Sequence, residues 1–336
     1  MVILSVKTMT QYIVVKGTSG IGNRVFAVAT GILYAQLSGR QLVVDWRDGS
    51  YSNTGTNLFF RYFDCPVAQS VEVLPVTDSV YPAIWKNKLH RSLGSLRNEL
   101  GLTGYSDMSF DVSSLDCQED ILVLSAYTHK INLMRPLLAQ ETNRLATMTI
   151  REILKYILQN NLFLKEDIRS RLDEFKRAYF EDYMVGVHIR YSDMKVPLTE
   201  VEFAVRSITR LTRFQHGNFK IFLATDSQEV LHSFKDKFPN VISTDKWFSE
   251  SGKRLHQNPE ECQDLVQNGI EALVDLYLLA ACDNLIFASR SSFGFLASLL
   301  MTQPNARYYD IDGEHSLVKR IKHKLINTAK QLNIYS

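Results

Sequence analysis

Both halves of this 336-residue chain alternate short apolar strands with helices. In the first half, a β-branched run at residues 12–15 precedes a glycine-rich turn, a long apolar helix over 23–37 and a second strand at 42–44. Strand, turn, helix and strand in this order are typical of a Rossmann-like unit. The second half repeats the alternation, with strands predicted at 184–189, 220–224, 241–243, 284–287 and 307–311 and helices between most of them.

Two amphipathic helices separate these halves. Apolar residues recur at helical spacing over residues 150–158 and again over 168–179. The chain is also too long for one ordinary core. We therefore predict an α/β protein of two Rossmann-like domains facing a cleft, residues 1–165 and 166–316. A basic amphipathic helix is predicted over 317–336, and a docked helix is a better interpretation of it than a membrane-surface anchor.

Composition and charge exclude several classes of protein. The chain is 45% apolar and 22% charged with a net charge of +2, which favours a globular protein and argues against a nucleic-acid binder. It has no signal-peptide pattern and no apolar run long enough for a transmembrane helix. We expect a cytoplasmic protein, or one peripheral to the membrane. Its scattered cysteines indicate free thiols rather than disulfides or a zinc site: Cys65, Cys117, Cys262 and Cys282.

The strand at 184–189 runs directly into charged residues. His188, Arg190 and Asp193 lie at or just beyond its carboxyl end, where open α/β sheets bind ligands. An arginine fixed there presents a planar fork of donors that suits a phosphate. A simple ion pair between Arg190 and Asp193 is the structural alternative.

The glycine-rich turn near the N-terminus offers a second candidate ligand site. Gly17, Gly20 and Gly22 precede a helix, and Asn23 follows them. The backbone of such a turn and the helix N-terminus favour anions, although a tight turn alone explains the glycines equally well. The spacing is not G-x-G-x-x-G, which argues against an NAD-dependent oxidoreductase.

Other polar residues follow strands of the second half or interrupt its helices. Asp226 either binds a ligand or caps the helix that begins near Gln228. Asp275 lies in an apolar helix and needs a partner, such as an arginine or a base edge. Ser291 and Ser292 form either a second anion site or an ordinary helix cap. Walker and H-E-x-x-H motifs are absent, so we expect no metal site.

Four motifs in order resemble those of the NodZ-type α1,6-fucosyltransferases, and more distantly the core α1,6-, protein O- and α1,2-fucosyltransferases. The motifs are G-I-G-N-R at 20–24 with V-D-W-R at 44–47, the strand ending in H-I-R at 188–190, F-L-A-T-D at 222–226, and the segment from Val274 through Ser291. The resemblance covers nearly the whole chain. Tyr191 stands where several members carry a second basic residue, and the segment after Asp193 does not align cleanly.

The resemblance implies a GT-B-like fold and an inverting glycosyltransferase that needs neither metal nor cofactor. GDP-fucose would be the donor substrate, and an oligosaccharide or glycoconjugate the acceptor. By position, Arg190 matches the arginine on the diphosphate, His188 and Asp275 match residues near guanine, Ser291 matches a phosphate contact and Asn23 a polar residue at the donor phosphates. The predicted donor-binding set is Gly22, Asn23, His188, Arg190, Asp226, Asp275, Ser291 and Ser292.

The sequence leaves the catalytic base and the acceptor site open. Arg190 is expected to stabilise the leaving phosphate, with Asp193 and Glu200 as catalytic candidates and Asp45 as a third possible base. Trp46, Tyr51 and Phe59 could stack on the acceptor sugar, although core packing is the simpler explanation for each. The alternative functions are transfer from another GDP-sugar and non-catalytic binding of a nucleotide or glycan.

Overall fold

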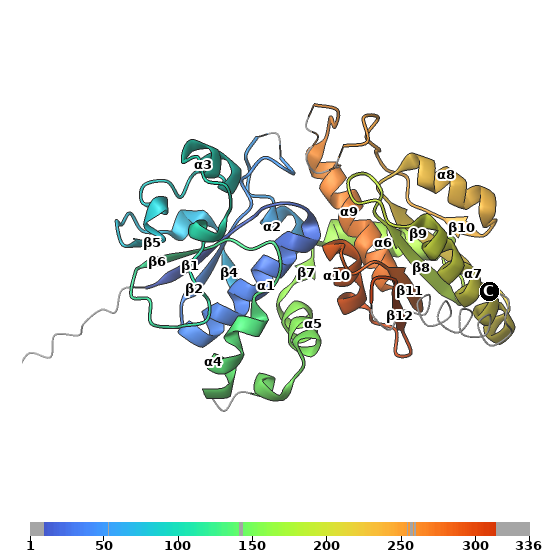
Figure 1. Ribbon diagram of the computed structural model, residues 1–336, viewed down its shortest axis with the longest axis horizontal. Coiled ribbons are helices and arrows are strands. Elements are labelled where there is room, and N and C mark those ends of the chain that lie inside the picture. Colours follow the sequence, from blue (N-terminus) through green and yellow to red (C-terminus); the bar gives the residue numbers. More distant parts are fainter. Residues whose placement is uncertain are drawn as a thin grey trace, which may run out of the picture. The chain divides into compact units, whose positions relative to one another are not determined.

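The structure is a computed structural model that describes residues 10–52, 54–140, 144–253, 255, 258 and 260–313. The chain divides into two compact units (Figure 1). Unit 1 comprises residues 1–165 together with Asp264–Val266, and unit 2 comprises the remainder. The C-terminal helix predicted over 317–336 lies outside the described residues.

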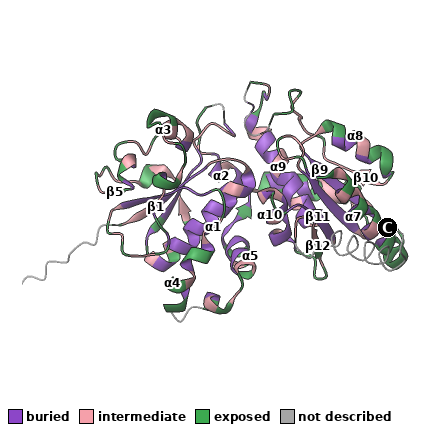
Figure 2. Cartoon of the chain, in the orientation of Figure 1, coloured by how far each residue is buried: buried purple, intermediate pink, exposed green. Residues whose placement is uncertain are grey.

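Unit 1 is built on a parallel five-stranded sheet in the order β4-β2-β1-β6-β5. Its central strands consist largely of Val, Ile and Leu and are buried along most of their length, as expected when helices or loops cover both faces (Figure 2). A separate antiparallel pair joins β3 to β7. The strands are β1 (Tyr12–Lys16), β2 (Gln41–Asp45), β3 (Phe63–Asp64), β4 (Ala68–Gln69), β5 (Val80–Tyr81), β6 (Ile121–Leu124) and β7 (Phe163–Leu164).

The longest helix of unit 1 connects β1 to β2. Helix α1 (Ile21–Ser38) begins directly after the glycine-rich turn, and Gly39 ends it in a left-handed conformation with φ +71°. Helix α5 (Ile150–Asn161) begins with a capping box between Thr149 and Glu152. The remaining helices are α2 (Phe59–Tyr62), α3 (Leu93–Glu99) and α4 (Arg135–Gln140), with 3₁₀ turns at Val71–Val73, Ala83–Trp85, Ser106–Met108, Ile131–Met134 and Arg144–Thr147.

Unit 2 contains a second parallel five-stranded sheet, in the order β10-β9-β8-β11-β12. The strands are β8 (Met184–Ile189), β9 (Lys220–Thr225), β10 (Val241–Ile242), β11 (Asn284–Phe287) and β12 (Arg307–Asp310). The helices are α6 (Glu166–Tyr179), α7 (Leu198–His216), α8 (Gln228–Lys237), α9 (Leu265–Ala280, apart from its first two residues) and α10 (Ser292–Leu300).

Side-chain contacts assign the helices of unit 2 to the two faces of its sheet. Val185, Val187 and Ile189 of β8 share a core cluster with residues of α7 and α8. On the opposite face, Gly186 packs against α9 and His188 packs against α10. Successive residues of β8 therefore point to opposite sides, as the pleat of a strand requires.

The predicted α/β architecture with two parallel sheets is confirmed. Each strand predicted in the second half is present within one or two residues of its expected bounds. Residues 50–115, where the sequence analysis predicts no strand, also contribute β4 and β5 to the first sheet. These strands are two residues long, too short to show a period in the sequence.

Candidate active site

The carboxyl ends of the parallel strands of unit 2 bring the predicted residues to one edge of the sheet. Residues 190, 226 and 289–292 follow the adjacent strands β8, β9 and β11. The register pairs Ile189 with Thr225, so Arg190 and Asp226 leave the sheet at the same level. This edge is where open α/β sheets bind their ligands.

Arg190 forms a bidentate ion pair with Asp193. Its Nε donates to Asp193 Oδ1 at 2.7 Å and its Nη2 to Oδ2 at 2.9 Å. Both side chains are 19% exposed, so the pair remains open to solvent. The structure thus contains the ion pair that the sequence offered as an alternative. No bond from Nη1 to any described residue accompanies it, which leaves one edge of the guanidinium available for a ligand.

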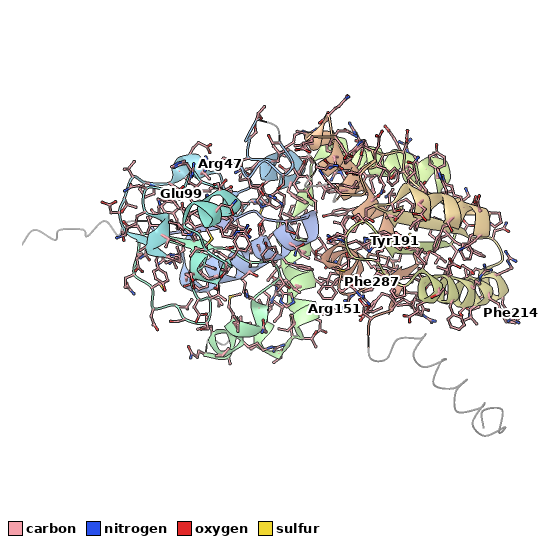
Figure 3. The ribbon with its side chains drawn as sticks, turned by 45° about the horizontal axis from the view of Figure 1, so that its top comes forward. Arg47, Glu99, Arg151, Tyr191, Phe214 and Phe287 are labelled. Carbon is pink, nitrogen blue, oxygen red and sulfur yellow. The ribbon has the colours of Figure 1, made fainter. Side chains whose placement is uncertain are left out.

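Asp226 holds the loop that carries Arg190. Its Oδ1 accepts from the backbone N–H groups of Tyr191 at 2.6 Å and Ser192 at 3.2 Å, and its Oδ2 accepts from Ser192 Oγ at 2.6 Å. Tyr191 is labelled in Figure 3. The cap interpretation of Asp226 is wrong, because Ser227 is the residue that caps α8. Asp226 therefore fixes the backbone on which the guanidinium is mounted.

His188 is buried in a neutral state on the α10 side of β8. Its ring stacks on Phe293 with centroids 5.1 Å apart and an interplanar angle of 27°. Burial lowers its pKa to about 3, and the positive charges of Arg190 and Lys246 act in the same direction. Nδ1 has no hydrogen-bond partner among the described residues. A buried imidazole nitrogen left without a partner is costly and indicates a position for a ligand atom or a water molecule.

Ser291 presents a second buried group of this kind. It occupies the N-cap position of α10 and is fully buried, yet its side chain makes no capping bond. Its Oγ has no partner within the part of the chain that the structure describes. The hydroxyl therefore lies unused at a helix N-terminus, where the backbone dipole favours anions. Ser292 forms the first residue of the helix itself.

The charged partner of Asp275 is Lys246, a residue that the sequence analysis did not single out. Its carboxylate accepts from Thr244 Oγ1 at 2.6 Å and from Lys246 Nζ, and the side chains of Lys246 and Asp275 are only 9% and 4% exposed. The backbone N–H of Trp247 also donates to Glu271, one turn earlier on α9. Residues 244–247 thus run along α9 and place a fixed positive charge near His188.

Glu200 lies in the first turn of α7 and lines a cavity of about 640 Å³. Arg290 also lines this cavity, and its Nε donates to Asp312 Oδ1 at 2.9 Å. That hydrogen bond raises the pKa of Arg290, and the negative charge of Glu200 adds to the effect. Sequence analysis missed Arg290 because it considered only the serines of this turn. The cavity is lined by Pro197, Glu200, Ser289, Arg290, Ile311 and Asp312.

In unit 1, Gly22 and Asn23 lie in the first turn of α1, at the carboxyl end of β1. The side-chain amide of Asn23 donates to the carbonyl of Tyr127. The adjacent Arg24 is buried and donates from Nε to the Ser19 carbonyl at 2.8 Å. The Asn23 contact joins the start of α1 to the loop that follows β6, and the Arg24 contact joins it to the glycine-rich turn.

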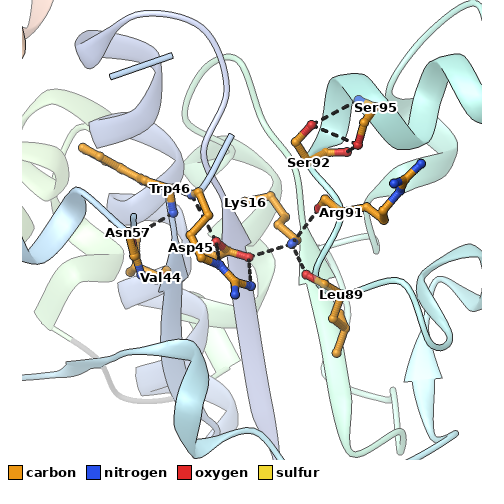
Figure 4. A network of polar contacts seen from close by, with 10 residues as sticks. Lys16, Val44, Asp45, Trp46, Asn57, Leu89, Arg91, Ser92 and Ser95 are labelled. Atoms are coloured by element: carbon orange, nitrogen blue, oxygen red, sulfur yellow. Dashed lines mark hydrogen bonds and ion pairs between the residues drawn. The ribbon is translucent and has the colours of Figure 1, made fainter. Parts of the chain in front are cut away.

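Asp45 belongs to a buried network at the ends of β1 and β2 (Figure 4). Lys16 Nζ donates to its Oδ2 at 2.6 Å, and Arg47 Nε to its Oδ1 at 2.8 Å. Burial alone would raise the pKa of Asp45, but the bonds and charges of Arg47 and Lys16 outweigh burial and lower it. A carboxylate held ionised by two cations is a weak proton acceptor, which argues against Asp45 as the base.

The three aromatic residues suggested for the acceptor are core residues. Trp46, Tyr51 and Phe59 are 2%, 5% and 0% exposed. Trp46 packs edge-on against Phe59 with ring centroids 5.1 Å apart. Such buried rings offer no surface on which a sugar could stack, so core packing is the correct explanation for all three.

Residues 148–325 match the family model of Nodulation protein Z (NodZ), which covers more than half of the chain. The chain belongs to the NodZ family. Among curated relatives of this family, Nodulation protein Z of Azorhizobium caulinodans is 25% identical over 88% of this chain and 89% of its own length. That of Sinorhizobium fredii is 25% identical over 95% and 99%.

Solved structures of NodZ share the fold. A NodZ α1,6-fucosyltransferase co-crystallised with GDP superposes with a TM-score of 0.60 at 25% identity, covering 88% of this chain and 93% of the other. A structure of a mutant of Arabidopsis thaliana FUT1 in complex with GDP superposes with a TM-score of 0.56 at 17% identity, covering 91% of this chain and 72% of the other. The resemblance and the GT-B-like fold inferred from the motifs are both confirmed.

The NodZ match includes the whole carboxyl edge of unit 2. His188, Arg190, Asp226, Asp275 and Ser291 fall within it, whereas Gly22 and Asn23 lie before residue 148. No group of three or more His, Cys, Asp or Glu side chains that could hold a metal ion occurs among the described residues. The helices described are too short or too polar to cross a membrane.

Proposed function

We propose that this NodZ-family protein transfers fucose from GDP-fucose to a hydroxyl of a glycan acceptor, with inversion and without a metal ion. Family membership supports the reaction class, and a relative of this family binds GDP in the crystal. A protein of Arabidopsis thaliana described as probable fucosyltransferase 9 is 24% identical over 85% of this chain and 59% of its own length. The observation that carries the proposal is the carboxyl edge of the unit 2 sheet. There Arg190 directly follows β8, and His188, two residues earlier, has a buried Nδ1 that bonds to no described residue.

In the proposed reaction, the acceptor oxygen attacks the anomeric carbon of fucose while the bond to the β-phosphate oxygen breaks. GDP leaves with that electron pair, and the acceptor proton passes to a base. Negative charge develops on the phosphate, and a donor fixed before the reaction stabilises this charge without further reorganisation. Arg190 meets this requirement, because Asp193 orients its guanidinium and Asp226 holds its backbone loop.

The proton acceptor is assigned to Glu200. Both oxygens of Asp193 are engaged by Arg190, so Asp193 serves to orient the guanidinium. Asp45 is held by Lys16 and Arg47. Glu200, in contrast, lines a solvent-open depression together with Arg290 and Asp312. A carboxylate beside such a space can accept a proton from a bound hydroxyl.

The neutral imidazole of His188 and the hydroxyl of Ser291 would complete the donor site. Each is buried, and each retains hydrogen-bonding capacity that no described residue meets. A neutral imidazole can either donate or accept, so it suits a phosphate oxygen or a hydroxyl. Lys246 would contribute a fixed positive charge that its buried pairing with Asp275 keeps in place.

The test is the rate of GDP release from GDP-fucose, with GDP affinity measured separately by calorimetry. Arg190→Ala is expected to reduce turnover by roughly 10²–10³, the usual loss for one transition-state donor. Arg190→Lys should recover little, because an ammonium group cannot replace a planar fork. Arg169→Ala is the matched control, because Arg169 also pairs with a carboxylate three residues away but lies exposed on α6.

The outcomes separate the alternatives. Near wild-type turnover in a folded Arg190→Ala chain would refute the role of the guanidinium. GDP-fucose binding without any GDP release would favour a non-catalytic binding protein. Faster release of GDP from GDP-mannose than from GDP-fucose would assign a different donor sugar to the same site.

A further inference from the structure

Tyr127 is an exposed aromatic residue at the carboxyl edge of the unit 1 sheet. The chain leaves β6 at Leu124 and remains buried through Ser125 and Ala126, then reaches the surface at Tyr127, which is 45% exposed. β6 lies next to β1, whose carboxyl end carries the glycine-rich turn. Tyr127 thus occupies the ligand-binding edge of its own sheet.

Neighbouring elements fix this exposed side chain. The Tyr105 ring packs edge-on against the Tyr127 ring, with centroids 5.4 Å apart and an interplanar angle of 65°. The side chains of Tyr105 and Thr18 lie close to the Tyr127 hydroxyl, and the Tyr127 backbone carbonyl accepts from the Asn23 side chain. A flexible exposed tyrosine would lose rotamer freedom on binding, whereas this one is already ordered.

Polar groups border the ring. The guanidinium of Arg97 lies 5.0 Å from the centroid of Tyr105, and Thr18 adjoins the Tyr127 hydroxyl. Burial raises the pKa of Tyr127 and Tyr105 raises it further, so the hydroxyl stays protonated at neutral pH. An apolar ring face bordered by hydroxyl and guanidinium donors complements a pyranose, which has an apolar C–H face and hydroxyls around its rim.

We propose that Tyr127, with Tyr105, Arg97 and Thr18 around it, is a stacking platform for a sugar ring of the acceptor. The inference rests on the proposed function, since a fucosyltransferase must hold a glycan acceptor as well as its donor. It replaces the suggested acceptor residues Trp46, Tyr51 and Phe59, which are buried, with a ring that solvent reaches. Asn23 connects the platform directly to the first turn of α1.

The full chain is first tested for binding to an array of neutral oligosaccharides. An oligosaccharide that binds is then used as the acceptor in solution. Tyr127→Ala is expected to raise the KM for that acceptor about fivefold to tenfold, the loss typical of one aromatic contact. Tyr127→Phe, which keeps the ring, should stay within about twofold of the parent. Saturation-transfer NMR should show contact to pyranose C–H protons in the parent and the Phe variant, and lose it in the Ala variant.

Phe163→Ala is the matched control, because Phe163 belongs to the same unit and is also 45% exposed. Its KM should equal that of the parent. An unchanged KM in folded Tyr127→Ala, or no oligosaccharide bound by the parent, would overturn the platform. If the Tyr127 ring contacted guanosine more strongly than any sugar in the NMR experiment, the platform would also be overturned. Failure of the parent to bind GDP or release it from GDP-fucose would instead contradict the proposed function.

Discussion

The burial of His188 predicts a specific loss of stability in mild acid. The imidazole has an ordinary pKa of 6.5 in the unfolded chain, and burial with two nearby cations lowers this to about 3 in the folded chain. Between these two values the unfolded state binds a proton that the folded state does not. The free energy of unfolding therefore decreases as the pH falls below 6.5, and the loss continues until about pH 3.

The size of this effect follows from the two pKa values. Within the window the loss approaches about 1.4 kcal/mol for each pH unit, so it amounts to about 2 kcal/mol between pH 7 and pH 5. The measurement is urea unfolding at both pH values, for the parent and for His188→Asn. The parent should lose about 2 kcal/mol more than the variant, because asparagine does not titrate.

A control and an independent observation support the comparison. His232→Asn removes an exposed imidazole from α8 of the same unit and retains His188. Its free energy of unfolding should therefore fall between pH 7 and pH 5 by as much as that of the parent. NMR of histidine-labelled protein should show the His188 imidazole neutral at pH 5. Equal acid sensitivity in the parent and His188→Asn, or an imidazole that titrates near pH 6.5, would refute the assigned burial.

Two further perturbations test the packing around the site. Lys246→Met leaves the Asp275 carboxylate buried without its cation. Urea unfolding should therefore show a loss of about 3–5 kcal/mol in the free energy of unfolding. The double variant Lys246→Met/Asp275→Leu should recover most of this loss. Gly294→Ala would place a Cβ 2.8 Å from Phe287 Cβ and 2.9 Å from His188 Nδ1. This variant should lose about 1–3 kcal/mol of unfolding free energy in the same assay. An unchanged stability in either variant would contradict the prediction and show that the surrounding side chains relax.

The sequence predicts elements well where local pattern and tertiary role agree. The apolar run of β8 is bounded by polar residues on both sides, and its predicted and observed limits coincide at Met184–Ile189. The same holds for β11 at Asn284–Phe287. The two-residue strands β4 and β5 carry no such pattern, because only their sheet neighbours define them. Element length therefore decides how much of the fold is visible in the sequence.

The candidate site was only partly predictable, because residue type does not reveal side-chain partners. Asp275 clearly needed a partner, but that partner is Lys246, which lies in a loop without periodicity. The sequence analysis offered Asp226 as a cap of α8, but the cap is the next residue, Ser227. Trp46 is flanked by Asp45 and Arg47 in the sequence, yet it is only 2% exposed, because the rings of Phe59 and Phe63 pack against it.

Two ion pairs of unit 2, Lys246–Asp275 and Arg190–Asp193, differ in how readily their cation could exchange its carboxylate for a diphosphate. Lys246 and Asp275 have side chains only 9% and 4% exposed, and separating them would leave an uncompensated buried charge. The side chains of Arg190 and Asp193 are 19% exposed, so water can solvate either group when the pair opens. An incoming phosphate can therefore share or replace Asp193 at a modest cost. Under the proposed function, this difference supports a direct phosphate contact by Arg190, while Lys246 stays paired with Asp275.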